Sequence, residues 1–351
     1  MATIKKKWEW AKTKMKILLD ESKKFYKANL HCHSKNSDGS LSPEEIKEAY
    51  KLRGYSAVAY TDHEHIINNS HLTDSEFVAL VGCEIAIKEN PTGSTLTSPD
   101  MKATHLCLYA KDDHCEITPC YNSAADHFIN DRVRDKIRHN GEFPREYGHM
   151  GISEIIEKCH EEGFLVCYNH PGWSLESAED YLGYEGADFV EIINTGSVVK
   201  GLYDDEAAFA EMLRAGKKIF CTAADDNHNR KPLTSPHSDS FGAFVMINAP
   251  SLSYQTLIGA LEKGDFYASE GPEIYSLTEE DGTVHIKCSP VRKISILSRG
   301  RRSRAVYPAE GEEFITEATL DAGESADGFR IRIEDAKGKR AFTQFYPLSR
   351  P

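Results

Sequence analysis

The sequence predicts a protein of the α/β class that is followed by a small all-β domain, and two patterns support this prediction. Between about residues 27 and 271, short apolar, β-branched runs alternate with longer helical patterns, which is typical of repeated βα units around a parallel sheet. After residue 273 the pattern changes to alternating strands, and the Asp281-Gly282 and Lys337-Gly338 pairs indicate hairpin turns.

Seven apolar runs in the first part are expected to form the strands of the sheet. Helical patterns separate them, and the one that starts at residue 42 carries a clear start signal. Ser42 can cap the helix, Pro43 suits its first position, and Glu45 can reach back to the cap. The runs span residues 27–32, 56–61, 78–84, 104–110, 164–169, 188–194 and 218–224.

Two segments lie outside this regular alternation. Residues 1–27 are rich in lysine with interspersed apolar residues, and we expect a basic amphipathic helix that packs on the outside of the main domain. Residues 111–151 form a long insertion, a length that is common for lids and substrate loops. Within it, residues 126–139 indicate a charged helix, which is either solvated or binds substrate phosphate through Arg132, Arg134 and Arg138.

Composition and charge limit the function. With 351 residues and 40% hydrophobic content, the chain can bury one large core in residues 28–272 and add a small domain over residues 273–351. A net charge of −13 argues against a stable nucleic-acid complex through a broad basic face. The nine cysteines lack regular spacing, no leader is visible and no run approaches the ~20 apolar residues of a membrane span. We therefore expect a cytoplasmic location.

Histidines and carboxylates stand where the predicted strands end. The carboxyl ends of parallel strands meet on one face of a barrel, so we expect these side chains to converge. Imidazole nitrogens and carboxylate oxygens without thiolates suit catalytic zinc, manganese or iron better than a structural zinc site. His31 and His33 end the first run, His63 ends the second and Glu84 ends the third, whereas His170 follows the fifth run and Asp226 with His228 follows the seventh.

The strings NLHCHSKNSDGSLSPEEI, TDHE, GCE, THLCLY, NHP and DDNH follow one another in this order over about residues 28–275. Together they resemble the PHP (polymerase and histidinol phosphatase) family of metal-dependent phosphoesterases. The resemblance implies a distorted (β/α)7 TIM-like barrel that binds two or three divalent ions, which are zinc, manganese or iron. Nine positions match the family: His31, His33, Asp38, His63, Glu84, His105, His170, Asp226 and His228.

The same resemblance implies how these ligands are shared. His105 precedes its apolar run instead of following it, so it is placed at the site by the resemblance alone. The general acid is not assigned by the sequence. The implied nucleophile is a water bound to the first ion, which is held by His31, His33, Glu84 and Asp226. The second ion is held by Glu84, His105 and His170, and the third by Asp38, His63 and His228.

Two further aspartates, Asp62 and Asp225, stand next to candidate metal ligands in the sequence. Asp62 directly precedes His63, and we expect it to orient a ligand histidine through the ring N–H instead of binding a metal itself. Asp225 neighbours Asp226, but the spacing Asp226-x-His228 matches the family pattern, so Asp226 is the expected ligand.

These observations favour hydrolysis of phosphate esters, with a small phosphorylated metabolite, a nucleotide or a short oligonucleotide end as substrate. Two alternatives stay open. An amidohydrolase that splits C–N bonds also uses His-x-His after its first strand, although it usually has two metals and a bridging lysine. A non-catalytic binding module stabilised by its metals is the other. The sequence indicates no particular oligomeric state.

Overall fold

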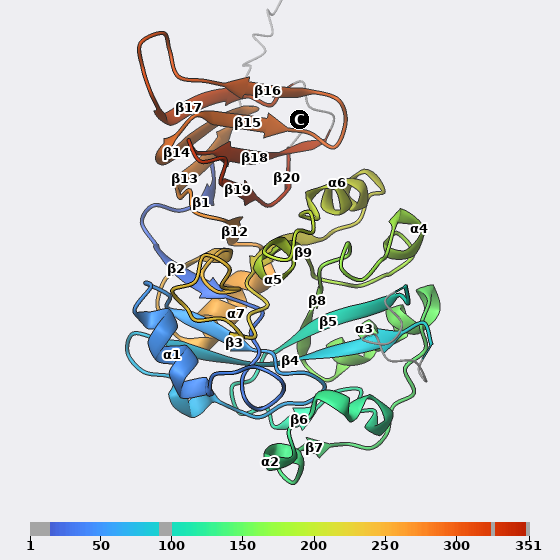
Figure 1. The fold of residues 1–351 in the computed structure, drawn as a ribbon. Helices are drawn as coiled ribbons and strands as arrows, with labels where there is room; N and C mark the ends of the chain where they lie inside the picture. The colour runs from blue at the N-terminus through green and yellow to red at the C-terminus, as the bar shows by residue number, and fades with distance from the viewer. Residues whose placement is uncertain (1–14, 91–99, 324–326, 349–351) are drawn as a thin grey trace, which may run out of the picture.

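The computed structural model describes residues 15–90, 100–323 and 327–348, and it has two parts (Figure 1). A mixed α/β part carries the predicted strands, and an antiparallel part built from β13 to β20 lies above it in this view. Each part has its own apolar core. The mixed α/β class and the separate antiparallel sheet are therefore as the sequence predicts.

All seven predicted runs form strands, and they are hydrogen-bonded in the order β10-β9-β8-β5-β4-β3-β2. Most of their residues are buried, as expected of strands that are covered on both faces. The strands are β2 (Lys24–Asn29), β3 (Ala57–Tyr60), β4 (Val78–Lys88), β5 (Ala103–Ala110), β8 (Phe164–Tyr168), β9 (Phe189–Asn194) and β10 (Phe220–Ala224).

The direction of β5 differs from the expected parallel sheet. It pairs antiparallel with both β4 and β8, whereas the pairs β2–β3, β3–β4, β8–β9 and β9–β10 are parallel. A buried apolar strand has the same composition in either direction, so the sequence could not show the reversal. The consequence is that the amino end of β5 lies at the edge where its neighbours have their carboxyl ends.

Among the described residues, the ladder hydrogen bonds do not close this sheet into a ring. The segments that directly follow β2 and β10 are nevertheless joined, because Asp226 N–H donates to the His31 carbonyl (2.9 Å) and His33 N–H donates to the Asn227 carbonyl (3.1 Å). On its other edge β2 pairs antiparallel with β11 (Phe244–Ala249), which pairs with β12 (Phe266–Ser269). A closed (β/α)7 barrel stays a prediction.

Helices cover the mixed part, and the first begins as the sequence indicates. The Ser42 hydroxyl accepts from Glu45 N–H, and the Glu45 carboxylate accepts from Ser42 N–H at 2.7 Å. Ile46 and Tyr50 form its buried face. The helices are α1 (Pro43–Lys51), α2 (Asp131–Arg134), α3 (His149–Glu161), α4 (Ala178–Tyr181), α5 (Thr195–Val198), α6 (Glu206–Arg214) and α7 (Tyr254–Lys263), with 3-10 turns η1 (Ser70–Leu72) and η2 (Ser123–Phe128).

The prediction of one charged helix over residues 126–139 is wrong. The insertion contains η2, the single turn of α2 and the short parallel pair β6 (Ile117–Thr118) and β7 (Arg138–His139). Asn130 starts a new turn, because its side chain accepts from Arg132 N–H at 3.1 Å. Only Val133 of that turn is buried, so no apolar face supports a longer helix.

The helix expected over residues 1–27 is also corrected where the structure describes it. Residues 1–14 lie outside the described residues, but β1 (Lys16–Leu19) is a strand and β2 begins at Lys24. β1 pairs antiparallel with β13 and buries Leu19 in the core of the antiparallel part. Strand pairing with a distant segment therefore overrides the local helical pattern.

The antiparallel part forms two layers. One is the sheet β1-β13-β14-β17, and the other continues from β12 through β19, β18, β15 and β16, with β20 paired to β18. The predicted turns at Asp281-Gly282 and Gly338 have the left-handed backbone that tight hairpins need. The strands are β13 (Ile274–Glu280), β14 (Thr283–Val291), β15 (Lys293–Leu297), β16 (Ser303–Val306), β17 (Ile315–Asp321), β18 (Gly328–Glu334), β19 (Arg340–Thr343) and β20 (Tyr346–Pro347).

Two general expectations can be compared with the structure. All nine cysteines lie within the described ranges, and each is a free thiol. Among the described residues, no helix is both long and apolar enough to cross a membrane.

A buried charge network joins the two parts, and it gives a first prediction. The Glu206 carboxylate at the start of α6 accepts from Arg330 (2.9 Å) and Arg332 (2.8 Å) of β18. Arg330 is only 6% exposed, and Glu206→Gln removes the negative charge that balances it. The substitution should therefore lower the free energy of unfolding by about 3 kcal/mol. Denaturant unfolding measures this loss.

The matched control is Glu21→Gln, because Glu21 forms an ion pair with Lys287 in which both side chains are more than half exposed. It should change the stability by less than about 0.5 kcal/mol. Equal effects of the two substitutions would contradict a stabilising role of the Glu206 network.

Candidate metal centre

The structure brings the nine candidate ligands together at one edge of the mixed sheet. The loop after β2 carries His31, His33 and Asp38, and the loop after β10 carries Asp226 and His228. The other four come from β3, β4, β5 and β8 or the residues next to them. Six of the nine are buried, and Asp38, Asp226 and His228 are partly exposed.

Glu84 lies at the centre of this cluster. The prediction that it ends its strand is wrong, because β4 continues to Lys88, but its carboxylate lies among imidazoles from five different positions. The contacts are 3.2 Å to His31 Nε2, 3.5 Å to His33 Nε2, 3.0 Å to His63 Nδ1, 3.0 Å to His105 Nδ1 and 3.4 Å to His170 Nε2.

A second part of the cluster surrounds Asp226. Its Oδ1 lies 3.3 Å from His31 Nε2 and 3.0 Å from His33 Nε2, and the two imidazole nitrogens are 3.2 Å apart. Asp225 points away: its buried carboxylate accepts from the Tyr50 hydroxyl and the backbone N–H groups of the turn at residues 241–243. The choice of Asp226 over Asp225 therefore agrees with the geometry.

The third part is built around Asp38. Its Oδ1 lies 3.3 Å from His228 Nε2 and 3.7 Å from His63 Nε2. His33 stacks against both of these rings, with centroid distances of 4.2 Å to His63 and 4.3 Å to His228. Ligand atoms of all four residues come within 4.8 Å of one another.

These groups fit divalent cations, and they differ in detail from the implied ligand sets. Every donor is an imidazole nitrogen or a carboxylate oxygen, which is the donor set of catalytic zinc, manganese or iron. His33 joins the third group, and His31 joins the group of Glu84 and His170. His105 reaches the centre through Glu84. The three groups are His33, Asp38, His63 and His228; His31, Glu84 and His170; and His31, His33 and Asp226.

The reversed direction of β5 explains His105. This residue lies near the amino end of its strand, which would point away from the site in a parallel sheet. Because β5 is antiparallel to β4 and β8, its amino end lies at the edge of the cluster. His105 therefore lies beside Glu84, where a parallel strand would not have placed it, and its role as a metal ligand stays a prediction.

Charges in the cluster show opposing effects on the pKa values. Burial and the neighbouring imidazoles of His63 and His228 lower the pKa of His33 to about 4. Burial also acts against protonation of His63, but its hydrogen bond to Glu84 and the charge of that carboxylate outweigh it and raise the pKa to about 9. Because metal ligands must be deprotonated, an ion that binds here would have to displace a proton from His63 more than from His33.

Backbone strain accompanies the cluster. His170 has a φ of 27° and Asp226 a φ of 50°, a left-handed region that side chains other than glycine rarely adopt. Such strain persists only where surrounding contacts hold it, and it is common at functional sites.

Glu191 and Asn194 of β9 hold His31, which follows β2, in its orientation. Glu191 is buried and its Oε1 lies 3.1 Å from His31 Nδ1, which leaves Nε2 directed to Glu84 and Asp226. Asn194 donates to Glu191 at 2.8 Å and to Asp226 at 3.2 Å. Carboxylate partners of this kind fix the ring orientation of metal-binding histidines.

The predicted role of Asp62 is not the one in the structure. Its carboxylate accepts from the backbone N–H and hydroxyl groups of Ser34 and Ser37, at 2.7 to 3.1 Å. These four hydrogen bonds fix the turn between His33 and Asp38. Asp62 therefore positions Asp38 instead of holding a histidine ring.

Sequence reasoning missed several residues that hold the loop after β8. The buried Glu176 carboxylate accepts hydrogen bonds from the hydroxyls of Thr104, Tyr147, Tyr168 and Tyr184. Trp173 of the same loop packs on His105 and His170, with centroid distances of 4.9 Å and 5.0 Å. Nearness to His170 in the sequence was the only signal for Trp173, and a single sequence gives none for Glu176.

The insertion is anchored against the strand that carries Glu84. Arg145 donates to the Glu64 carboxylate, to the Ala86 carbonyl (3.2 Å) and to the Cys120 carbonyl (2.9 Å). Its side chain and that of Glu64 are each only 3% exposed. Arg145 thus connects the insertion to the neighbourhood of the cluster.

A cavity of about 560 Å³ opens onto the cluster, which is within the usual size range of ligand pockets. Arg132, Arg134 and Arg138 are exposed and do not line it, so their role in substrate binding gains no support. Its basic lining residues are Lys88, Lys200, Arg230 and Lys231.

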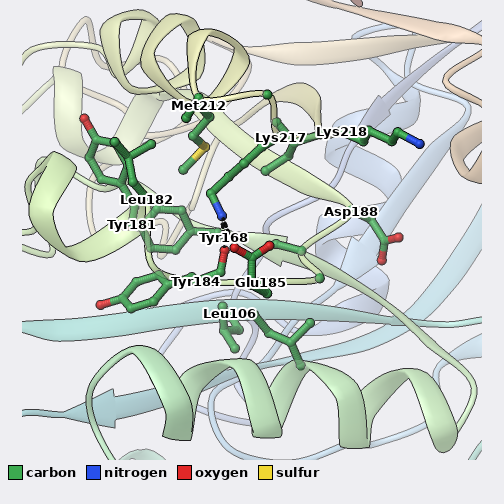
Figure 2. Close-up of a pocket in the computed structure, with 16 residues that line it drawn as sticks. Leu106, Tyr168, Tyr181, Leu182, Tyr184, Glu185, Asp188, Met212, Lys217 and Lys218 are labelled. Atoms are coloured by element: carbon green, nitrogen blue, oxygen red, sulfur yellow. Dashed lines mark hydrogen bonds and ion pairs between the residues drawn. The ribbon is translucent and has the colours of Figure 1, made fainter.

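A second cavity, of about 500 Å³, lies away from the cluster and has an aromatic lining (Figure 2). Lys217 extends into it between Tyr184 and Glu185 and donates to the Tyr184 carbonyl (2.6 Å) and the Glu185 carboxylate (3.0 Å). None of the nine candidate ligands lines this cavity. The candidate ligands that line a cavity therefore belong to the first one.

Fold and side chains define a two-part, mixed α/β protein with a buried His/Glu/Asp cluster suited to binding metals. No family model matches the chain, and no curated protein is significantly similar to it. Its structure is similar to that of a two-domain protein from Bacteroides vulgatus ATCC 8482 containing a predicted PHP-like metal-dependent phosphoesterase. The TM-score is 0.43 at 14% identity, over 95% of this chain and 96% of that chain.

Two further solved structures cover less of the chain. One is a candidate metal-dependent phosphoesterase from Bifidobacterium adolescentis ATCC 15703, with a TM-score of 0.35 at 15% identity over 60% of this chain and 91% of that chain. The other is an amidohydrolase from Chromobacterium violaceum with bound sulfate and no metal, with a TM-score of 0.35 at 14% identity over 57% and 87%. At such identities these likenesses concern the fold alone.

The turn held by Asp62 gives a second prediction. Asp62→Ala removes four hydrogen bonds from the segment that carries Asp38, so we expect the protein to bind about one metal fewer per chain while the sites around Glu84 and Asp226 stay filled. Metal content by mass spectrometry after gel filtration measures this. Asp113→Ala, at a position remote from the cavity, is the control, and an unchanged metal content in Asp62→Ala would contradict the assigned role.

Proposed function

We propose that this protein is a metal-dependent hydrolase of phosphate esters, with a small phosphorylated metabolite, a nucleotide or a short oligonucleotide end as its substrate. The observation that carries the proposal is the convergence of five imidazoles and three carboxylates in three overlapping groups beside one cavity, with a sixth imidazole, that of His105, on Glu84. The number of overlapping groups supports a cluster of two or three ions over a single one.

Charge supports phosphate as the group that is bound. Three divalent ions would bring six positive charges, and Asp38, Glu84 and Asp226 bring three negative ones, which leaves three positive charges for an anionic substrate. Divalent ions in such clusters neutralise the charge that develops on a phosphoryl group and activate water near neutral pH.

The residues of the chain have distinct tasks in this proposal. Glu84 and the histidines around it hold the cluster together, and Glu191 keeps the His31 ring turned so that Nε2 faces it. Trp173 covers His105 and His170 and excludes water from that side. Asp62 and Asn194 fix Asp38 and Asp226 through the contacts described above.

The group around Asp38 argues against the amidohydrolase alternative. A two-metal site would leave Asp38, His63 and His228 without a purpose, although these residues lie together with His33.

The proposal also covers the fold, the location and the kind of substrate. The bonds between the ends of β2 and β10 support a distorted (β/α)7 barrel. Nine free thiols support a reducing location such as the cytoplasm, and the net charge of −13 supports a small anionic substrate over a stable nucleic-acid complex.

Metal analysis paired with a phosphate-release screen tests the function. Protein purified without added metal should contain two or three divalent ions per chain, and the loaded protein should hydrolyse p-nitrophenyl phosphate or members of a nucleotide panel. His33→Ala should lower the rate at least about a hundredfold, because His33 contacts both Glu84 and Asp226.

The control is His285→Ala, since His285 is exposed on β14, remote from the cluster. Hydrolysis of amides or lactones without phosphate release would favour the amidohydrolase. If chelation lowers the melting temperature and no ester is hydrolysed by the loaded protein, the binding module is favoured instead.

A further inference from the structure

Four basic side chains line the cavity that opens onto the cluster. Lys88 ends β4, Lys200 follows α5, and Arg230 and Lys231 follow β10, so three separate segments contribute them. We call these four residues the cation rim. All four line the same cavity, although the net charge of the chain is −13.

The three lysines of the cation rim have no internal task. No hydrogen bond or ion pair joins the side chain of Lys88, Lys200 or Lys231 to another residue that the structure describes. Arg230 differs, because its Nη2 donates to Asp38 Oδ2 at 2.7 Å. The lysines are therefore available to a ligand, while Arg230 is shared with the cluster.

Acidic residues of the cavity do not neutralise the cation rim. Asp38, Glu84 and Asp226 belong to the cluster, where divalent ions would outweigh their charge. Asp239 also lines the cavity, and its carboxylate accepts from the backbone N–H groups of His228 (2.9 Å) and Asn229 (3.2 Å). Its single negative charge is smaller than the three positive charges of the lysines, so positive charge remains that the cavity itself does not balance.

The cluster alone would satisfy the charge of one phosphoryl group, so the cation rim requires another explanation. We propose that Lys88, Lys200 and Lys231 select substrates that carry a second anionic group, a phosphate or a carboxylate, away from the phosphoryl group bound at the cluster. This inference rests on the proposed function and narrows its substrate class to phosphate esters with a further anionic group. A cavity of about 560 Å³ has room for both groups of such a molecule.

The experiment measures binding without turnover. Two phosphonates serve as probes, because their P–C bond is not hydrolysed: 4-(phosphonomethyl)benzoate carries a second negative charge, and its amide, 4-(phosphonomethyl)benzamide, has nearly the same shape without it. Calorimetric titration of the metal-loaded protein at low salt should give at least about tenfold tighter binding of the benzoate, and the difference should shrink at high salt.

The variant Lys88→Gln/Lys200→Gln/Lys231→Gln should bind both probes with nearly equal affinity. Its metal content and its affinity for the benzamide should stay within about twofold of the unaltered protein, since the cluster is intact. The control Lys136→Gln/Lys263→Gln/Lys287→Gln loses the same charge from exposed positions that do not line the cavity, and it should keep the full preference.

The outcomes separate this inference from the proposed function. If both probes bind equally to the unaltered protein, or if the triple variant keeps the preference, the selection by the cation rim is refuted while phosphoryl binding stands. If neither phosphonate binds to the metal-loaded protein, both proposals are refuted.

Discussion

One buried carboxylate sets the arrangement of the rest of this site. Glu84 is 1% exposed and lies within 3.5 Å of imidazole nitrogens from five histidines. A charge removed from water in this way is tolerated only when partners surround it, and here the partners come from four strands or the loops that follow them. Each of those segments must therefore reach the same point, and this requirement constrains the sheet and its loops.

The scaffold supplies this constraint through contacts that have no catalytic task. Glu176 accepts from four hydroxyls and fixes the loop that begins at His170, while Asp62 fixes the turn that leads to Asp38. The left-handed backbone at His170 and Asp226 is held in place by this dense packing. A rigid shell of this kind holds the imidazoles close together before any cation binds between them.

The cation rim belongs to a different level of organisation. It consists of exposed or half-exposed side chains on loops and at a strand end, where substitution costs little stability. In the proposed function, the cluster performs the chemistry and the cation rim selects which molecules bind beside it.

Local patterns in the sequence determined the seven strands of the mixed part, the capping box at Ser42 and the hairpin turn at Asp281-Gly282, because these depend on neighbouring residues alone. The spacing of histidines and carboxylates also indicated the cluster, since side chains at strand ends converge on one face. Only the tertiary structure decided the antiparallel direction of β5, the strand β1 in place of a helix, the role of Asp62 and the membership of the cation rim. Each of these depends on contacts between segments that are far apart in the chain, and such contacts leave no mark on the local pattern of a single sequence.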